Sequence, residues 1–141
     1  MANKKCQICF EGHLHHTTKE DTISFKGYTH TVKQPGLWCD TCGEAVLSGA
    51  DLKATEKEIE HFKKQVKLKI AQEVKESRKK LNITQKKASD LFGGGINAFS
   101  RYERGEVVPP LSTLTLIRVL SKHPELLKEV EAQHKELSLC S

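Results

Sequence analysis

Apolar and polar residues follow two different spacings along the chain. Between Ile23 and Val32 they alternate, which is typical of β-strands. Lys26-Gly27 separates the two alternating arms, so we expect a β-hairpin that turns there. From Ser48 onwards apolar residues recur every three or four positions, which is typical of amphipathic helices. The pattern therefore predicts a β-hairpin near the N-terminus, followed by helices.

The helical segments are separated by residues that favour helix starts and ends. Ser48 is a suitable N-cap, with Asp51 placed where a short acidic side chain stabilises the first turn. In the helix expected to follow, the apolar residues Leu52, Ile59, Phe62 and Val66 lie at helical spacing. A separate helix should run from about Leu68 to Lys80 and bury Ile70, Val74 and Leu81. Three further helix starts are indicated by an N-cap at Thr84, an N-cap at Ser112 and a first-turn proline at Pro124.

A run of three glycines divides two of these helices. The helical pattern that begins at Thr84 stops at the glycines, and a short helical pattern follows from Ile96 to Gly105. A helix, a tight turn and a short helix are the sequence form of a helix-turn-helix. Ile96, Phe99 and Tyr102 recur at three-residue spacing in the short helix, so we expect all three to face the core.

The opposite face of the short helix carries groups that can read DNA bases. Asn97 and Arg101 are four residues apart, so they should project side by side. Asparagine pairs bidentately with adenine and arginine with guanine in the major groove. The alternative is a helix face that is only solvated, as such faces commonly are. Three further residues complete the candidate DNA-binding set: Gln85, Ser100 and Arg104.

Four of the five cysteines form two Cys-x-x-Cys pairs, Cys6 with Cys9 and Cys39 with Cys42. Two such pairs supply the four thiolates of a tetrahedral structural zinc site, so we expect one zinc ion per chain. A site closed by four thiolates leaves no open position for water, so we infer no catalysis there. A rubredoxin-like iron site is the alternative metal. A thiol redox motif is disfavoured because no βαβ pattern surrounds the pairs.

The remaining metal-binding side chains have no assigned role. His13, His15 and His16 lie near the first cysteine pair, either as alternative ligands or as surface histidines. Cys140 lies near the C-terminus and is expected to be a free thiol.

The composition suits two small cores better than one large one. Hydrophobic residues make up 37% and aromatic residues 6% of the 141 positions. We place a boundary near Gln65 to Leu68, which gives domains of residues 1–67 and 68–141. The fold expected is an α+β N-terminal zinc domain with a β-hairpin and one helix, joined to an all-α C-terminal domain of five helices.

The charge and hydropathy of the chain indicate which classes of partner it can bind and in which compartment we expect it. The net charge of +5 permits binding to an anionic polymer, although lysines also form ordinary solvated helix faces. No apolar run approaches the roughly 20 residues of a membrane span, and the N-terminus lacks the apolar core of a signal peptide. We therefore expect a cytosolic protein with no membrane partner.

From Cys6 to about Val130 the chain resembles the MqsA family of antitoxins from bacterial type II toxin–antitoxin pairs. The resemblance depends on the two cysteine pairs, on the run Phe-Gly-Gly-Gly-Ile-Asn-Ala-Phe-Ser-Arg-Tyr-Glu-Arg-Gly at 92–105, and on Lys-His-Pro-Glu-Leu-Leu at 122–127. The second half is also similar to the Xre/Cro repressor class, through Thr84-Gln85, Ala88, Glu103-Arg104-Gly105 and Pro109. An extension from Glu131 to Ser141 follows the end expected for the family.

The resemblance implies a function for each domain. The zinc domain would bind and neutralise an mRNA-cleaving ribonuclease toxin. The C-terminal domain would form a homodimer and repress its own operon at a palindromic operator. Cys6, Cys9, Cys39 and Cys42 would be the zinc ligands, while Asn97 and Arg101 would read bases. Two rivals are a stand-alone zinc-containing repressor without a toxin partner and a thiol oxidoreductase.

Overall fold

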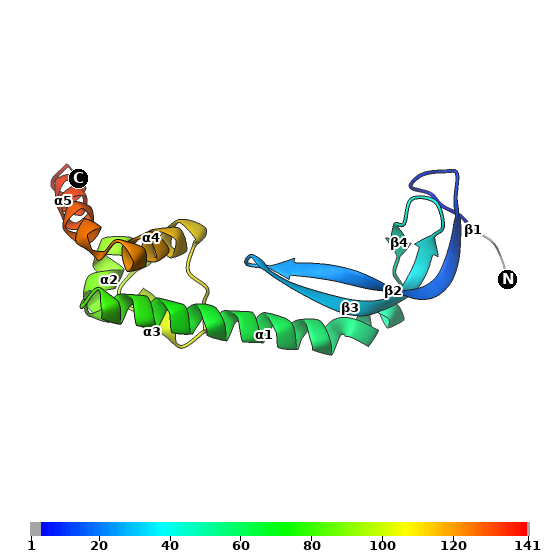
Figure 1. Ribbon diagram of the computed structural model, residues 1–141, viewed down its shortest axis with the longest axis horizontal. Helices are drawn as coiled ribbons and strands as arrows, with labels where there is room; N and C mark the ends of the chain where they lie inside the picture. Colours follow the sequence, from blue (N-terminus) through cyan, green and yellow to red (C-terminus); the bar gives the residue numbers. More distant parts are fainter. Residues whose placement is uncertain (1–3, 141) are drawn as a thin grey trace. The chain divides into compact units, whose positions relative to one another are not determined.

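The computed structural model describes residues 4–140, and the chain divides after Val66 into two compact units. The first unit contains the strands β1 (Lys4–Lys5), β2 (His13–Phe25), β3 (Tyr28–Cys39) and β4 (Ala45–Val46). The helix α1 (Gly49–Lys80) contributes residues to both units. The second unit continues with α2 (Gln85–Phe92), α3 (Ala98–Glu103), α4 (Leu111–Lys122), a 3₁₀ turn at Pro124–Leu126 and α5 (Leu127–Leu139) (Figure 1). The expected α+β part with a hairpin and the expected five-helix part are both confirmed.

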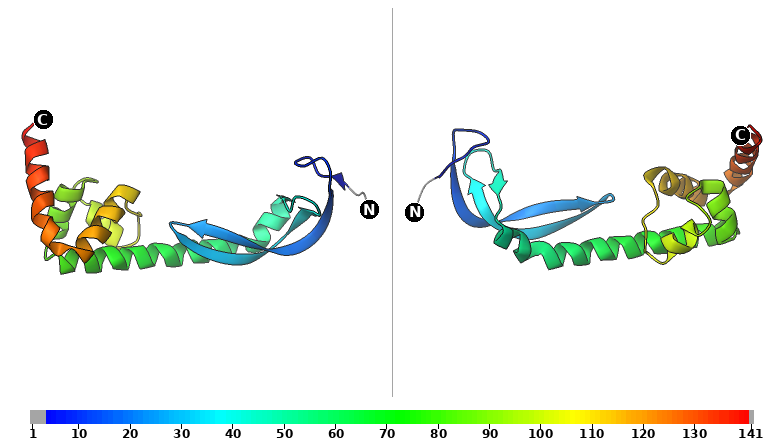
Figure 2. Two further views of the ribbon diagram at one scale, coloured as in Figure 1. Left: turned by 45° about the horizontal axis from the view of Figure 1, so that its top comes forward. Right: turned by 180° about the vertical axis from the view of Figure 1, so that it is seen from behind.

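The four strands form one antiparallel sheet in the order β1-β2-β3-β4. β2 and β3 pair continuously from Leu14 opposite Cys39 to Phe25 opposite Tyr28, and both further views show this long hairpin (Figure 2). Lys26 and Gly27 form the turn with φ values of 52° and 85°. Two positive φ values are typical of the hairpin turn that matches the right-handed strand twist. The predicted turn position is therefore confirmed, although the strands extend well beyond the predicted arms.

The helical part of the first unit packs on one face of β3 through polar contacts. Gln34 is buried in this face, and its amide donates to the carbonyl oxygen of Asp51 at 2.9 Å. The hydroxyl of Thr55 donates to the amide oxygen of Gln34 at 2.8 Å. Leu52 shares the helical spacing of the apolar residues but is exposed. The helix positions that meet the buried glutamine are the polar ones, Asp51 and Thr55.

The start of α1 is fixed by a reciprocal cap, as predicted for Ser48 and Asp51. The backbone N–H of Ser48 donates to the carboxylate of Asp51 at 2.8 Å, and the N–H of Asp51 donates to the hydroxyl of Ser48 at 3.2 Å. The hydroxyl of Ser48 also donates to the carboxylate of Asp51 at 2.7 Å, and this bond, followed by the one from the Ser48 N–H, lowers the pKa of Asp51 below its ordinary value. α1 then continues for 32 residues, so the expected separate helices before and after Leu68 are one. No glycine or proline lies near the proposed boundary to end the helix.

The second unit has an apolar core to which α1, α2, α3 and α4 contribute. Its fully or nearly buried residues include Ile70, Val74, Leu81, Ala88, Phe99, Tyr102, Leu114, Ile117 and Leu120. α4 begins at Leu111 with Pro110 at the N-cap position, so Ser112 is not the cap that we expected. The backbone of Pro110 is extended, with ψ of 151°, and the helix begins immediately after it. No residue of α5 is buried in the described chain.

Candidate metal centre and helix-turn-helix surface

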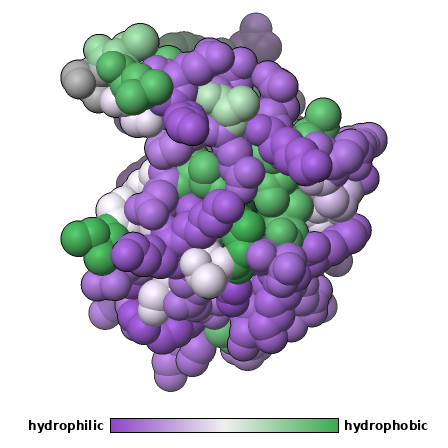
Figure 3. All heavy atoms as spheres, turned by 90° about the vertical axis from the view of Figure 1, so that its left-hand side faces the viewer, coloured by the Kyte–Doolittle hydropathy of each residue, from purple (hydrophilic) through white to green (hydrophobic). Residues whose placement is uncertain are grey.

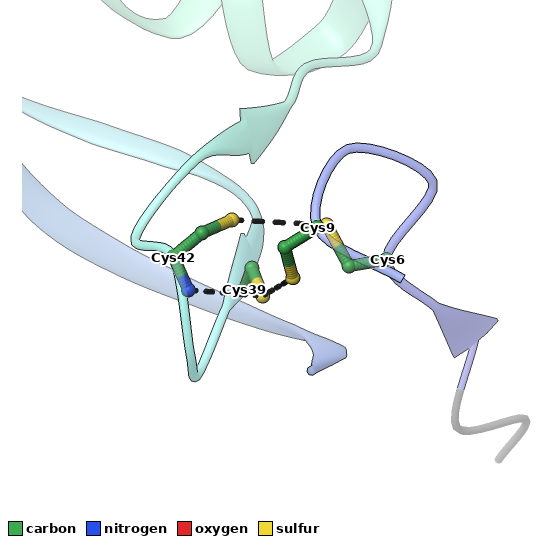
Figure 4. Close-up of side chains that lie close together, drawn as sticks. All are labelled: Cys6, Cys9, Cys39 and Cys42. Carbon is green, nitrogen blue, oxygen red and sulfur yellow. Dashed lines mark hydrogen bonds between the residues drawn. The ribbon is translucent and has the colours of Figure 1, made fainter. Parts of the chain in front are cut away.

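The four cysteines of the two pairs lie together in the first unit. Their sulfur atoms are all within 4.8 Å of one another, with Cys6 and Cys42 at 3.8 Å and Cys9 and Cys39 at 3.7 Å (Figure 4). A tetrahedron with zinc–sulfur bonds of about 2.3 Å has sulfur–sulfur edges of about 3.8 Å. The side chains therefore have the separation that one tetrahedral metal ion requires.

Backbone N–H groups point at the sulfur atoms in both knuckles. Ile8 donates to Cys6 and Gly12 to Cys9, each at 3.4 Å, and Thr41 donates to Cys39 at 3.4 Å. Such donors stabilise thiolates rather than thiols. The thiolate is the form that binds metal.

The thiols differ sharply in acidity. Hydrogen bonds from the backbone of Gly12 and Glu11 lower the pKa of Cys9 to about 6. A backbone bond from Glu44 lowers the pKa of Cys42, but desolvation and the neighbouring cysteines outweigh it and raise the value to about 12. Four adjacent negative charges repel one another, and a bound dication would offset that repulsion.

The two knuckles use glycine differently. Gly43 has φ of 76°, so it supplies the left-handed turn after Cys42. The corresponding position after Cys9 is Phe10, which has φ of 60° and is 71% exposed. Gly12 is needed for space, because a Cβ atom there would lie 2.5 Å from the sulfur of Cys39. Phe10 could not be identified from the sequence, because no residue pattern marks a bulky side chain at a position with positive φ.

The neighbouring histidines pair with carboxylates and are not part of the four-cysteine group. Nε2 of His15 lies 3.2 Å from Asp40, and Nε2 of His16 lies 3.5 Å from Asp51. The backbone N–H of His13 also donates to Asp40, and this bond, with those from Thr41 and His15, lowers the pKa of Asp40 to about 2. These contacts favour the interpretation of the histidines as surface residues.

In the second unit, α2 and α3 are joined by the glycine turn. The hydroxyl of Thr84 accepts from the N–H of Lys87 at 3.1 Å, which confirms Thr84 as the N-cap of α2. The three glycines all have positive φ. A Cβ atom on Gly94 would lie 2.7 Å from the hydroxyl oxygen of Tyr102, so this glycine also permits α3 to pack closely. The predicted helix, turn and short helix are present.

α3 is shorter than expected and begins at Ala98, with Asn97 in the N-cap position. Phe99 and Tyr102 are buried as predicted, but Ile96 is 88% exposed. The prediction for Ile96 is wrong because the residue lies in the turn before the helix, where the helical period does not apply. Asn97 and Arg101 are both exposed, one helical turn apart, and the N–H of Arg101 donates to the carbonyl oxygen of Asn97.

The other three candidate DNA-binding residues lie around α3. The amide of Gln85 donates to Glu103 at 2.9 Å. The guanidinium of Arg104 donates to the hydroxyl of Ser100 at 2.7 Å and pairs with Glu106 at 2.8 Å. Arg101 also lies 3.8 Å from Glu106. The structure thus brings Ser100, Arg101 and Arg104 together with the exposed carboxylate of Glu106, while Gln85 is bonded to the buried carboxylate of Glu103.

Comparisons with known proteins identify the family of this chain. Residues 4–131 match the family model described as the antitoxin component of a bacterial toxin–antitoxin system, MqsA. The chain is 41% identical over 129 residues to Antitoxin MqsA of Escherichia coli (strain K12), which covers 89% of this chain and 98% of that protein. No helix within residues 4–140 has the length and apolar character needed to cross a membrane. The chain therefore belongs to the MqsA family of bacterial antitoxins.

Proposed function

We propose that this protein is the antitoxin of a type II toxin–antitoxin system, which neutralises an mRNA-cleaving toxin and represses its own operon by sequence-specific DNA binding. The observation that carries the proposal is the 41% identity to an antitoxin across 98% of that relative's length. The match spans both the four-cysteine unit and the helix-turn-helix, so it supports both activities. Neither activity requires catalysis by this chain.

The four cysteines would hold one structural zinc ion per chain. The sulfur separations of 3.7 and 3.8 Å suit the zinc tetrahedron, and the buried cluster that contains Cys6 and Cys39 adds only Leu14 among the described residues. Structural zinc contributes about 10–16 kcal/mol in finger peptides at neutral pH. Metal binding would therefore decide whether the first unit folds.

The first unit offers two features for toxin binding. Beyond its short pairing with β1, the outer edge of β2 has no strand partner within residues 4–140, so a toxin strand could be added there. A groove of about 570 Å³ also lies beside the first knuckle. Its lining residues include Lys4, Lys5, Phe10, Leu14, Leu37 and Val46. An exposed apolar groove with a positive rim fits an apolar and acidic surface on the toxin.

The second unit would place α3 in the major groove. Asn97 would pair with adenine and Arg101 with guanine, each pairing giving roughly 1–3 kcal/mol of discrimination. Gln85, Ser100 and Arg104 would position the helix by contacts to the DNA backbone. The hydrogen bonds that these three side chains make around α3 support a preformed surface.

A homodimer formed through the second unit would place two such helices on a palindromic operator about 34 Å apart. α5 supports this proposal because its residues complete no core in the described chain. Leu126, Leu137 and Leu139 remain exposed, and the face of the molecule on the α5 side of Figure 1 shows apolar patches among hydrophilic ones (Figure 3). A two-fold contact would remove such side chains from water.

Expression of the reading frame next to this gene tests the proposal. Alone, it should arrest growth and cleave mRNA, and co-expression of this chain should restore both growth and intact mRNA. The chain should also shift DNA from upstream of its own gene in preference to scrambled DNA. A harmless neighbouring product together with retained operator binding would instead support a stand-alone repressor.

A further inference from the structure

Ile96 lies two residues before the start of α3, and its apolar side chain is exposed to solvent. At 88% it is the most exposed large hydrophobic residue in the described part of the chain. The N–H of Ala98 donates to the carbonyl oxygen of Gly95 at 3.2 Å, so Ile96 and Asn97 occupy the two central positions of a turn. The backbone therefore fixes the place of Ile96, while its side chain has no partner in the core.

Other side chains already fill the core next to this turn. Ala98, Phe99 and Tyr102 are buried, and Ala98 and Tyr102 also pack closely around Gly94. Ile96 is thus not a core residue displaced by a small shift of the helix. Burial of an isoleucine side chain is favourable, whereas its exposure to water is not. Ile96 would therefore be stabilised by a surface that covers the start of α3.

The surroundings of Ile96 indicate the chemistry of that surface. Asn97 follows it directly, Arg101 lies in α3 and Arg104 is the C-cap residue of α3, and all three are exposed. A polar amide and two guanidinium groups on the segment that follows this apolar side chain are poorly suited to an apolar protein patch. They suit the floor of a major groove, which presents hydrogen-bonding edges, nearby phosphates and one kind of apolar group, the C5 methyl of thymine.

We infer that Ile96 reads a thymine methyl group in the operator, either in the adenine–thymine pair contacted by Asn97 or in the pair next to it. The inference rests on the proposed DNA-binding function and adds a third specificity residue to Asn97 and Arg101. Consecutive Cα atoms are about 3.8 Å apart, close to the spacing of about 3.4 Å between stacked base pairs. Adjacent residues of the turn can therefore address the same or adjacent pairs.

Deoxyuridine scanning of the operator tests this inference with the full-length, zinc-loaded protein. Each thymine of one half-site is replaced in turn by deoxyuridine, which keeps the base pairing and removes only the methyl group. For the unaltered protein, one replacement should weaken binding about fourfold, the effect expected for one buried methyl-sized group. Ile96→Ala should bind the native operator several-fold more weakly and should be insensitive to deoxyuridine at that same position.

A matched control distinguishes loss of a specific contact to thymine from a general effect of removing an exposed apolar side chain. Leu111→Ala also shortens an exposed apolar side chain, at the start of α4, and should keep the full response to deoxyuridine. Thermal unfolding of both variants should be close to that of the unaltered protein, because both side chains are solvent-exposed.

The outcomes distinguish failure of the inference from failure of the proposed function. If the unaltered protein does not prefer operator over scrambled DNA, the proposed function itself is wrong. If that preference exists but no deoxyuridine replacement weakens binding, or Ile96→Ala remains equally sensitive, then only the role of Ile96 is overturned.

Discussion

Arg78 near the end of α1 and Glu103 at the end of α3 form a forked ion pair in the second unit. The Nε of Arg78 donates to one carboxylate oxygen, and Nη2 donates to the other at 3.2 Å. Only 4% of the Glu103 side chain is exposed. Gln85 of α2 donates to the same carboxylate, so this one group joins three helices behind the exposed face of α3.

Substitution Glu103→Gln should destabilise the second unit, because it leaves the guanidinium of Arg78 without its charged partner. Removing one member of a buried pair typically costs roughly 3–5 kcal/mol, and partial access of Arg78 to water places the expected loss near the lower end. Urea unfolding followed by circular dichroism measures the change. Glu125→Gln removes a carboxylate that faces an exposed histidine and should cost less than about 1 kcal/mol. Equal stability of the two variants would contradict the structural role of the pair.

The same pair predicts how stability depends on pH. Burial raises the pKa of Glu103, but the hydrogen bonds from Arg78 and Gln85 outweigh it, so the pKa lies below its ordinary value. A carboxyl group with a lower pKa in the folded state stabilises it fully above its unfolded pKa of about 4.3 and loses that effect as the pH falls further. The free energy of unfolding should therefore decline below about pH 4. In Glu103→Gln this part of the decline should disappear, which a urea titration at several pH values would show.

Metal removal should affect the two units unequally. Chelation, or Cys39→Ser, should unfold the first unit if the proposed zinc ion supplies most of its folding energy, as structural zinc does in finger peptides. The second unit has its own apolar core and should keep its helical signal. Zinc analysis should give one ion per chain for the unaltered protein and for the control Cys140→Ser, whose thiol is exposed. A single cooperative loss of both units on chelation would show that they do not fold independently.

Several parts predicted correctly from the sequence depend on short-range spacing. The turn at Lys26-Gly27 and the cap at Thr84 each involve residues a few positions apart, so local chemistry determines them. The grouping of the four cysteines joins positions up to 36 apart, and it was predictable because a tetrahedral metal site requires four ligands, which two Cys-x-x-Cys pairs supply. The partnership of Arg78 with Glu103 joins residues 25 positions apart, and only the fold brings them together. An acidic residue near the C-terminal end of a helix is unfavourable unless it has a partner, but sequence spacing does not identify Arg78 as the partner of Glu103.

Departures from the sequence pattern have equally specific causes. Ile96 fits the three-residue spacing of the short helix, but the spacing does not show where the helix begins. Three glycines let the turn extend two residues further, and Ile96 then lies outside the helix. Leu52 fits a helical face, but the buried face of α1 meets Gln34, so Asp51 and Thr55 are buried instead.

Changing the two proposed base-reading residues should remove sequence preference and leave the fold intact. Asn97→Ala and Arg101→Ala should each lose roughly 1–3 kcal/mol of discrimination, which corresponds to about five- to 150-fold in affinity for the operator over scrambled DNA. Both side chains are exposed, so helical content and toxin binding should not change. Fluorescence anisotropy with the two DNA fragments measures the preference. Lys122→Ala removes one exposed charge from α4 and should preserve it; retained preference in both α3 variants would show that another surface reads the bases.

Glu106 should limit the affinity of the protein for DNA. Its carboxylate pairs with Arg104 at 2.8 Å and lies 3.8 Å from Arg101, and these contacts hold its pKa below the ordinary value. Near neutral pH it is therefore negatively charged, and it competes with phosphate for the two guanidinium groups. Glu106→Gln should strengthen binding about two- to fivefold to operator and scrambled DNA alike, since exposed ion pairs are weak and salt screens them. Anisotropy titrations at two salt concentrations would measure this gain, which should shrink at higher salt. Weaker binding by Glu106→Gln would mean instead that the carboxylate orients the arginines for base contact.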